Sequence, residues 1–377
     1  MPHGVFAYDE LSYPEVAALP RWVPLVIPLG EGYDLAELAR LLGSPPALGM
    51  LPALPYGWQG SRLAVPPAIF DPLLANLADN LREDGFQRVF VLMPPGITCG
   101  LGGMEVRLPS TDPVEALPPA SELGKVILLP VGHTEQHGHH LPLNVDSVLI
   151  EAVSRGAQAQ APGKAFSLPV FPYGVSTHRR AFAGTMNVGG RVFEDFWLAV
   201  VDNLVLRGFQ TLYLLSGHGG NCSFLTNVVK YAGERFPGSF IATAWLYLSG
   251  PQGVRALEKY RRSPLGGMGH ACELETAMML HLRPELVNMS KVIDETDFIA
   301  TPSYSMDWIE CGALVANPPW TDDTRTGAYG AGSLATARNG RLWLEAAIGE
   351  KAGHIDEILE QFQRRSARRR ENWFMQK

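Results

Sequence analysis

Residues 131–146 read VGHTEQHGHHLPLNVD and bring four histidines, one glutamate and one aspartate together in sixteen residues. Imidazole and carboxylate groups form the mixed nitrogen and oxygen sites that suit zinc, manganese or iron. Glu135 and His137 are two residues apart, so in an extended or irregular loop their side chains point the same way. Asp146 falls at the expected start of a helix, where its carboxylate could also cap backbone amides. The stretch predicts a metal site.

Two later motifs could complete that site. His218 lies in SGHGGN, and its flanking glycines let the backbone approach a ligand closely. His270 begins HACELE, in which Glu273 comes three residues later and can share one side of a helix start with it. A lone loop histidine would more often be an ordinary surface residue, but several ligand types gathered at two loops favour metal binding.

Short β-rich runs alternate with amphipathic stretches from residue 125 onward. This alternation predicts βαβ units and a mostly parallel sheet with helices on both faces. The expected strands are Lys125–Pro130, Phe166–Phe171, Thr211–Ser216 and Ser239–Trp245, and the expected helices start near Asp146, Arg191, Asn221 and Cys272, with a last one after Ser333. Ligands of such sheets bind in loops at the carboxyl ends of the strands, where the motifs fall.

The first 120 residues resemble a truncated copy of the rest. PYGWQG at Pro55 matches PYGVST at Pro172, and LADNLREDGFQRVFVLMPPG at Leu77 matches VVDNLVLRGFQTLYLLSGHG at Val200. We predict an internal duplication, although chance similarity between two βαβ segments is the alternative. Residues 1–120 would form a degenerate α/β half-domain without metal ligands, serving assembly or shielding the site, and residues 121–377 the catalytic domain. The Pro-rich stretch at 109–124 would link them.

Composition excludes several classes of protein. The net charge of −7 argues against a nucleic-acid partner, and the arginine cluster at 364–370 is interpreted as the solvated end of a helix. No apolar run approaches the roughly 20 residues that cross a bilayer, and the N-terminus lacks the pattern of a secretion signal. The four cysteines show no CxxC spacing, so we expect reduced thiols and a cytoplasmic location.

The motifs together resemble the creatininase (creatinine amidohydrolase) family. The matching segments are EQHGHHLPLNVD at 135–146, PYGVSTH at 172–178 with FAGT at 182–185, GHGGN at 217–221 and HACELE at 270–275. The resemblance covers roughly residues 121–355. It implies a three-layer α/β/α fold with a mostly parallel central sheet and a hydrolase with two divalent ions. Glu135, His137, Asp146 and His218 would be ligands, with Asp146 bridging the ions.

Two departures from the family pattern affect the other roles. Creatininase has a glutamate ligand two residues after the GH histidine, where this chain has Gly220, so Glu273 is our substitute fifth ligand. The histidine of the second motif is shifted by one position to His178. We expect His178, Ser176 and Thr185 to contact substrate, His270 to act as general acid, and Glu275 to orient His270 or tune its pKa.

We therefore expect a hydrolase that acts on the C–N bond of a small, cyclic amide. Zinc is the first expectation for the metal, with manganese or iron as alternatives. The partners would be a small-molecule substrate and further copies in a homo-oligomer, without nucleic acid or membrane. One alternative is hydrolysis of another polarised carbonyl compound, such as a cyclic diketone. A non-catalytic metal-binding scaffold is another, but it would not need His270 with Glu275. Aromatic residues at 300–330 would cover a planar substrate or pack in the core.

Overall fold

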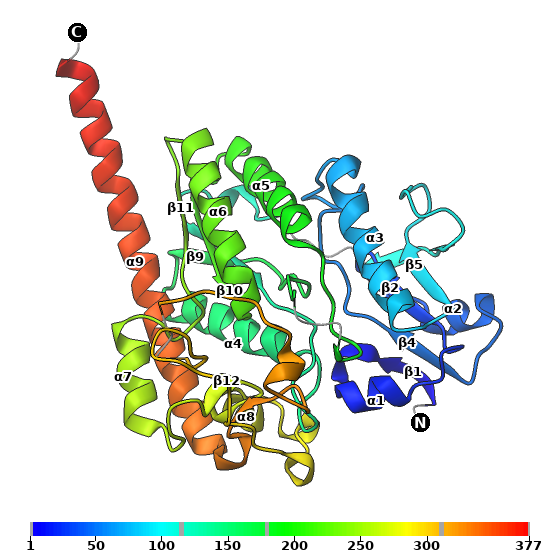
Figure 1. Ribbon diagram of the computed structural model, residues 1–377. Helices are drawn as coiled ribbons and strands as arrows, with labels where there is room; N and C mark the ends of the chain where they lie inside the picture. Colours follow the sequence, from blue (N-terminus) through cyan, green and yellow to red (C-terminus); the bar gives the residue numbers. More distant parts are fainter. Residues whose placement is uncertain (1–2, 113–116, 178–180, 309–312, 376–377) are drawn as a thin grey trace.

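The computed structural model describes residues 3–112, 117–177, 181–308 and 313–375, and two parallel sheets organise it (Figure 1). The first sheet has the order β1-β4-β2-β5-β6 and the second the order β11-β10-β8-β9. The strands of the first are β1 (Gly4–Ala7), β4 (Ala47–Met50), β2 (Leu25–Pro28), β5 (Val89–Met93) and β6 (Glu105–Arg107). Those of the second are β11 (Phe240–Thr243), β10 (Thr211–Ser216), β8 (Val126–Val131) and β9 (Ala165–Ser167).

The helices lie on both faces of these sheets. Those of the N-terminal unit are α1 (Tyr13–Ala18), α2 (Leu35–Leu41) and α3 (Pro67–Glu83). Those of residues 121–377, the expected catalytic domain, are α4 (Val145–Gln160), α5 (Gly190–Leu206), α6 (Gly219–Arg235), α7 (Pro251–Tyr260), α8 (Glu273–Leu282) and α9 (Ala337–Met375). Two small antiparallel pairs complete the described elements: β3 (Glu31–Tyr33) with β7 (Ser110–Asp112), and β12 (Met268–His270) with β13 (Tyr329–Gly330).

The central strand β8 shows why the catalytic domain has three layers. All six of its residues are buried, because helices cover both sides of the sheet. Val126 and Leu128 pack with α4, α8 and α9, whereas Ile127, Leu129 and Val131 pack with α5 and α6. The alternation of side chains along one strand therefore supplies two cores, and the expected three-layer α/β/α fold with a mostly parallel sheet is confirmed.

The expected elements are present, with shifted boundaries. Helices α4, α5, α6 and α8 begin within two residues of the expected starts, whereas α9 begins four residues after Ser333. The strand expected at 166–171 is shorter, because β9 ends at Ser167 and only a single bridge joins Phe171 to Val131. Part of the expected linker is also ordered, since β7 pairs with β3. At the other end, α9 projects well beyond the body of the molecule (Figure 1).

The N-terminal unit has the same strand order as the catalytic sheet. β4-β2-β5-β6 corresponds to β9-β8-β10-β11, and both sets are parallel. Even single hydrogen bonds recur: Gly30 N–H donates to Leu54 O at 3.0 Å, and Gly132 N–H donates to Phe171 O at 2.9 Å. The duplication stays a prediction, and this shared topology agrees with it.

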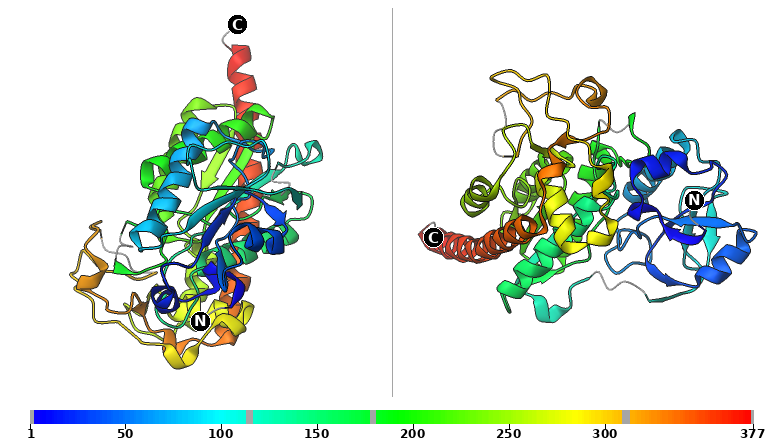
Figure 2. Two further views of the ribbon diagram at one scale, coloured as in Figure 1. Left: turned by 90° about the vertical axis from the view of Figure 1, so that its right-hand side faces the viewer. Right: turned by 90° about the horizontal axis from the view of Figure 1, so that it is seen from below.

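The two units share one hydrophobic core. Leu73 and Leu77 of α3 belong to the same cluster of buried side chains as Phe196 and Trp197 of α5. The N-terminal unit, blue to cyan in Figure 2, lies directly against the catalytic domain. It is therefore packed as part of one body rather than attached through a linker alone.

Candidate metal centre

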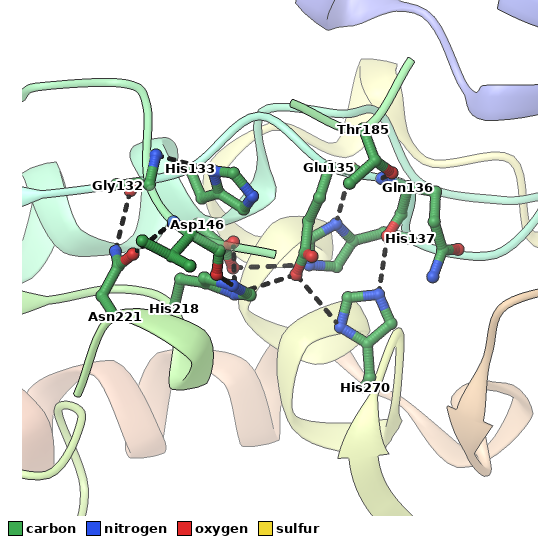
Figure 3. A network of polar contacts seen from close by, with 12 residues as sticks. Gly132, His133, Glu135, Gln136, His137, Asp146, Thr185, His218, Asn221 and His270 are labelled. Carbon is green, nitrogen blue, oxygen red and sulfur yellow. Dashed lines mark hydrogen bonds and ion pairs between the residues drawn. The ribbon is translucent and has the colours of Figure 1, made fainter. Parts of the chain in front are cut away.

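The side chains that could bind metal converge at the carboxyl ends of two neighbouring parallel strands (Figure 3). Two of them come from the loop after β8, and the first turns of α4 and α8 supply one each. The last two are the residue directly before α6 and the residue that ends β12. All six are buried: Glu135, His137, Asp146, His218, His270 and Glu275. The predicted convergence of the two strand-end loops is present.

Asp146 lies between two groups of these side chains. Its Oδ2 is 3.4 Å from Nδ1 of His218, which is itself 3.0 Å from Oε1 of Glu135. Its Oδ1 is 3.4 Å from Nε2 of His137, which is 3.9 Å from Oε1 of Glu275. One carboxylate thus presents one oxygen to each group, as a bridging carboxylate would.

Backbone carbonyls fix how the imidazole rings present their nitrogens. The contacts are Nδ1 of His137 with O of Glu135 at 3.1 Å, Nε2 of His218 with O of Val175 at 3.0 Å, and Nε2 of His270 with O of Gln136 at 2.6 Å. A nitrogen facing a carbonyl must carry hydrogen, so in the neutral ring the other nitrogen offers its lone pair to the site. This outer arrangement is typical of metal-binding histidines.

Buried atoms without hydrogen bonds indicate that a cation belongs here. Both carboxylate oxygens of Glu135, Nε2 of His137 and Oδ2 of Asp146 have no hydrogen-bond partner among the described residues when the facing histidines are neutral. Leaving such groups buried and unsatisfied is costly. A divalent ion would satisfy them, and the mixture of imidazole and carboxylate suits zinc or manganese. The residues present therefore fit the expected metal.

The charges of the site act on the histidines in the absence of metal. Burial opposes the charged form of His137, yet the carboxylates of Asp146 and Glu275 raise its pKa to about 10. Burial also opposes the charged form of His218, but the carboxylates of Glu135 and Asp146 raise its pKa to about 9. Protons thus compensate the carboxylates where a cation would otherwise do so.

Glu273 does not lie with the other expected ligands. Its carboxylate accepts hydrogen bonds from the backbone N–H groups of Arg262, at 3.0 and 3.1 Å, and Ser263, at 2.7 Å. Glu275, two residues further along α8, instead faces His137 across the site. The geometry therefore favours Glu275 over Glu273 as the fifth candidate ligand, because residues two apart on a helix point in different directions.

His270 lies at the edge of the cluster. Its Nδ1 is 3.5 Å from Oε1 of Glu135, and its ring is 4.2 Å from that of His137. Glu275 faces His137 at 3.9 Å, and its expected role of orienting His270 stays a prediction. Burial and the neighbouring His137 lower the pKa of His270 to about 3, so the ring is neutral near pH 7 and has to accept a proton before it can donate one.

The expected substrate contacts have different surroundings. Ser176 is buried, and its hydroxyl has no hydrogen-bond partner among the described residues. Thr185 uses its hydroxyl oxygen to accept the N–H of Gln136 at 2.9 Å, so it also holds the ligand loop. His178 lies outside the described residues. Of the expected aromatic cover, Trp320 packs against His270, with the ring centroids 4.9 Å apart.

Three further polar residues support the ligand loop. Asn221 accepts the N–H of Val175 at 2.9 Å and donates to O of Gly132 at 3.2 Å (Figure 3). Gln136 donates to O of Gly327 at 2.9 Å. His133 accepts the N–H of Gly174 through Nδ1 at 2.9 Å, and its ring is 4.4 Å from that of His218. In the sequence these residues stand as polar residues inside or beside glycine-containing motifs. Such a position predicts a role near the site, but it does not predict which group each side chain binds.

Comparison with known proteins identifies the family. The creatininase family model, described as creatinine amidohydrolase, matches residues 114–355, which is more than half of the chain. The chain belongs to the creatininase family.

Among curated family relatives, the chain is similar to creatinine amidohydrolase of Pseudomonas putida, with 28% identity over 63% of this chain and 90% of that protein. It is also similar to the mycofactocin precursor peptide peptidase of Mycobacterium ulcerans (strain Agy99), with 30% identity over 43% of this chain and 60% of that protein. A third relative is 3-dehydro-scyllo-inosose hydrolase of Thermotoga maritima, with 26% identity over 63% of this chain and 78% of that protein.

Solved structures of creatininases have the same fold. A putative creatinine amidohydrolase from Bacteroides fragilis NCTC 9343 gives a TM-score of 0.52 at 26% identity, covering 62% of this chain and 90% of that one. A mutant creatininase of the Zn-Zn type gives a TM-score of 0.52 at 25% identity, covering 63% of this chain and 91% of that one. These structures therefore leave more than a third of this chain unmatched.

The structure explains one departure from the creatininase pattern. A Cβ atom at Gly220 would lie 2.2 Å from O of Val175 and 2.4 Å from Nε2 of His218. Any side chain there would displace the histidine that faces Glu135 and Asp146. The missing glutamate thus agrees with local packing, and the carboxylate of Glu275 arrives from another helix.

Proposed function

We propose that this creatininase-family chain is a metal-dependent hydrolase that adds water across the C–N bond of a small, cyclic amide. The observation that carries the proposal is the position of Asp146 between two groups of candidate ligands. Glu135, His218 and Asp146 would hold one divalent ion, and His137, Asp146 and Glu275 the other. When bound, such ions lower the pKa of water and polarise a carbonyl.

His270 is the residue that would move the proton. In its neutral form it can accept the proton of the attacking water and return it to the leaving nitrogen, as the new C–O bond forms and the C–N bond breaks. Its second ring nitrogen faces O of Gln136 at 2.6 Å, which holds the ring in one orientation. We therefore assign it general base and then general acid, which extends the role expected from the sequence.

Hydrolysis of a different class of substrate is the second candidate. One relative is called a peptidase, and another hydrolyses 3-dehydro-scyllo-inosose. The same buried ligand set suits any polarised carbonyl, so a peptide-like amide or a ring ketone is the alternative substrate. A non-catalytic scaffold would not require His270 beside the ligands.

The wider setting is proposed on sequence grounds. We propose a cytoplasmic homo-oligomer with a small-molecule substrate, zinc as the metal and manganese as the alternative. None of the described helices combines the length and apolar character that a membrane-spanning segment needs.

The test combines metal analysis with a substrate screen. Elemental analysis of dialysed protein should find about two divalent ions per chain. The protein is then assayed on creatinine and other small lactams, short peptides and ring ketones, with and without a chelator. Hydrolysis of lactams that chelation abolishes supports the proposal. The proposal would be wrong if the protein binds no zinc, manganese or iron, and if adding these metals to the assay gives no hydrolysis of any of the compounds.

A further inference from the structure

The N-terminal unit contacts the loop that connects two candidate ligands. His137 and Asp146 are joined by residues 138–145, so the path of this loop sets where both side chains lie. Leu143 in the loop donates its N–H to O of Leu11 at 2.9 Å. Three residues of the N-terminal unit, Asp9, Leu11 and Tyr13, contact this loop, and we call residues 9–13 the contact segment.

The two other contacts of this segment use side chains. Asn144 donates through Nδ2 to Oδ2 of Asp9 at 3.2 Å. The hydroxyl of Tyr13 lies 3.0 Å from Nε2 of His139. His139 is two residues after His137 and Asn144 two residues before Asp146, so each contact acts close to one candidate ligand.

The contact segment is itself held in place. Tyr8 and Val16, which flank it, are fully buried. Ser12 and Glu15 form a capping box at the start of α1, with the N–H of Ser12 2.8 Å from Oε2 of Glu15. The ring of Tyr13 also packs edge-on against Phe182, with centroids 5.4 Å apart. A segment with these contacts can fix a loop, whereas a frayed terminus could not.

A second set of contacts comes from one face of α3. Asn76 donates to O of Val188 at 2.7 Å. The side-chain oxygens of Asn80 and Asp84 accept the N–H groups of Asn187, at 2.5 Å, and Gly184, at 2.8 Å. Residues 76, 80 and 84 are four apart and so share one side of the helix and its end.

The loop held by α3 leads back to the metal centre. It contains Thr185, which accepts the N–H of Gln136 at 2.9 Å. Met186 in the same loop donates to O of Thr134 at 2.9 Å. These two contacts bracket Glu135, so both loops around the candidate ligands rest on the N-terminal unit.

We infer that the N-terminal unit is a built-in positioning partner of the metal centre, acting through Asp9 and Tyr13 on one loop and through Asn76, Asn80 and Asp84 on the other. The inference rests on the proposed function. It differs from the expectation of a unit that only serves assembly or shields the site. Among the described residues the unit has no group of candidate ligands of its own, and it instead determines how rigidly the catalytic domain holds its ions.

The test uses single substitutions in the full chain. Tyr13→Phe removes one hydroxyl and keeps the ring on Phe182, and Asn80→Ala removes one contact of α3. Tyr33→Phe is the matched control, because it makes the same change in the same unit at a hydroxyl that bonds to O of Leu29. Zinc affinity is measured by competition with a chromophoric chelator. Hydrogen exchange is followed in residues 138–145 for Tyr13→Phe and in residues 184–188, the loop that α3 contacts, for Asn80→Ala.

Loss of groups that orient ligands typically weakens metal binding about 10–100-fold. Tyr13 contacts His139 and not a candidate ligand directly, so we expect a smaller effect, with zinc binding about threefold to tenfold weaker in Tyr13→Phe. We also expect faster exchange in the loop and a lower kcat with little change in KM. Tyr33→Phe should match the wild type in zinc affinity, in loop exchange and in kcat. Its melting temperature should be similar to that of Tyr13→Phe. The double variant Tyr13→Phe/Asn80→Ala should lose more affinity than either single variant.

Two failures are distinguishable. If the wild type binds zinc and hydrolyses a substrate, but Tyr13→Phe and Asn80→Ala match it in zinc affinity and in loop exchange, this inference is wrong and the proposed function stands. If the wild type itself binds no metal, the proposed function fails first.

Discussion

At the residue scale, His218 is the ligand whose removal has the simplest expected result. It faces Glu135 and Asp146, whereas Glu275, the carboxylate of the other group, faces His137. We expect His218→Ala to lose one of about two ions and to lose activity with it. Elemental analysis after gel filtration, together with the hydrolysis rate, measures both. A variant that keeps two ions would remove His218 from the ligand set.

Glu273 and Glu275 form a matched pair on one helix. Glu275→Gln should weaken metal binding, because a neutral amide replaces a carboxylate beside His137. Glu273→Gln should keep the metal and lower the free energy of unfolding by about 1–3 kcal/mol, because hydrogen bonds to a charged group are lost. Metal titration and urea denaturation of both variants separate these effects. The reverse result would restore Glu273 as the ligand.

His270 should separate metal binding from chemistry. His270→Ala removes the contact of His270 with Glu135, but Asp146, which lies between the two groups of candidate ligands, is untouched. We expect most of the metal to remain and kcat to fall about 10²–10⁴-fold, the usual contribution of a general acid–base residue. Metal content and steady-state kinetics are measured on the same preparation. Equal loss of metal and rate would make His270 a ligand.

At the scale of elements, α9 holds α7 through the carboxylate of Glu350, which also forms a buried ion pair with its neighbour Lys351 on α9. Glu350 accepts the N–H groups of Gly250, at 3.0 Å, and Gly253, at 2.7 Å, while its Oε1 is 2.9 Å from Nζ of the buried Lys351. Glu350 thus satisfies donors at the start of α7 that the helix leaves without internal partners. It links the projecting helix to the body of the catalytic domain.

Removing one partner of this pair leaves a buried charge uncompensated. We expect Glu350→Gln to lower the free energy of unfolding by about 3–5 kcal/mol. The double variant Glu350→Gln/Lys351→Met should recover part of the loss, because it removes the charge as well. Chemical denaturation measures both variants. A double variant that is less stable than the single one would show that the α7 hydrogen bonds, rather than the charge, dominate.

At the scale of the whole molecule, the shared core predicts that the catalytic domain does not stand alone. A chain that begins at Ser121 would expose the side of α5 that packs against the N-terminal unit, including Trp197, whose ring centroid is 6.3 Å from that of Tyr56. We expect it to aggregate or to form an altered oligomer, because large exposed apolar patches promote association. Light scattering checks this. Co-expression with residues 1–120 should restore the soluble state, and a truncated chain with unchanged assembly and metal affinity would contradict it.

The sequence determined the ligand loops, because their positions follow from local patterns. The apolar run of β8 predicted a strand covered on both faces, and parallel strands end at one edge. Glu135, His137, Asp146 and His218 could therefore be placed together before any coordinates. The repeated segments at Pro55 and Pro172 predicted two similar units; four strands of the first sheet follow the order of the second, and the duplication itself stays a prediction.

Tertiary structure decided what each group faces. Glu273 and Glu275 are chemically identical, and only the start of α8 at Glu273 and the packing of residues 262–263 against it separate them. His139 and His140 are adjacent in the sequence, yet one meets Tyr13 and the other Thr276. The contact between residues 9–13 and the metal loop joins segments about 130 residues apart in the chain. Such choices depend on the packing of distant segments, which local propensity and spacing do not encode.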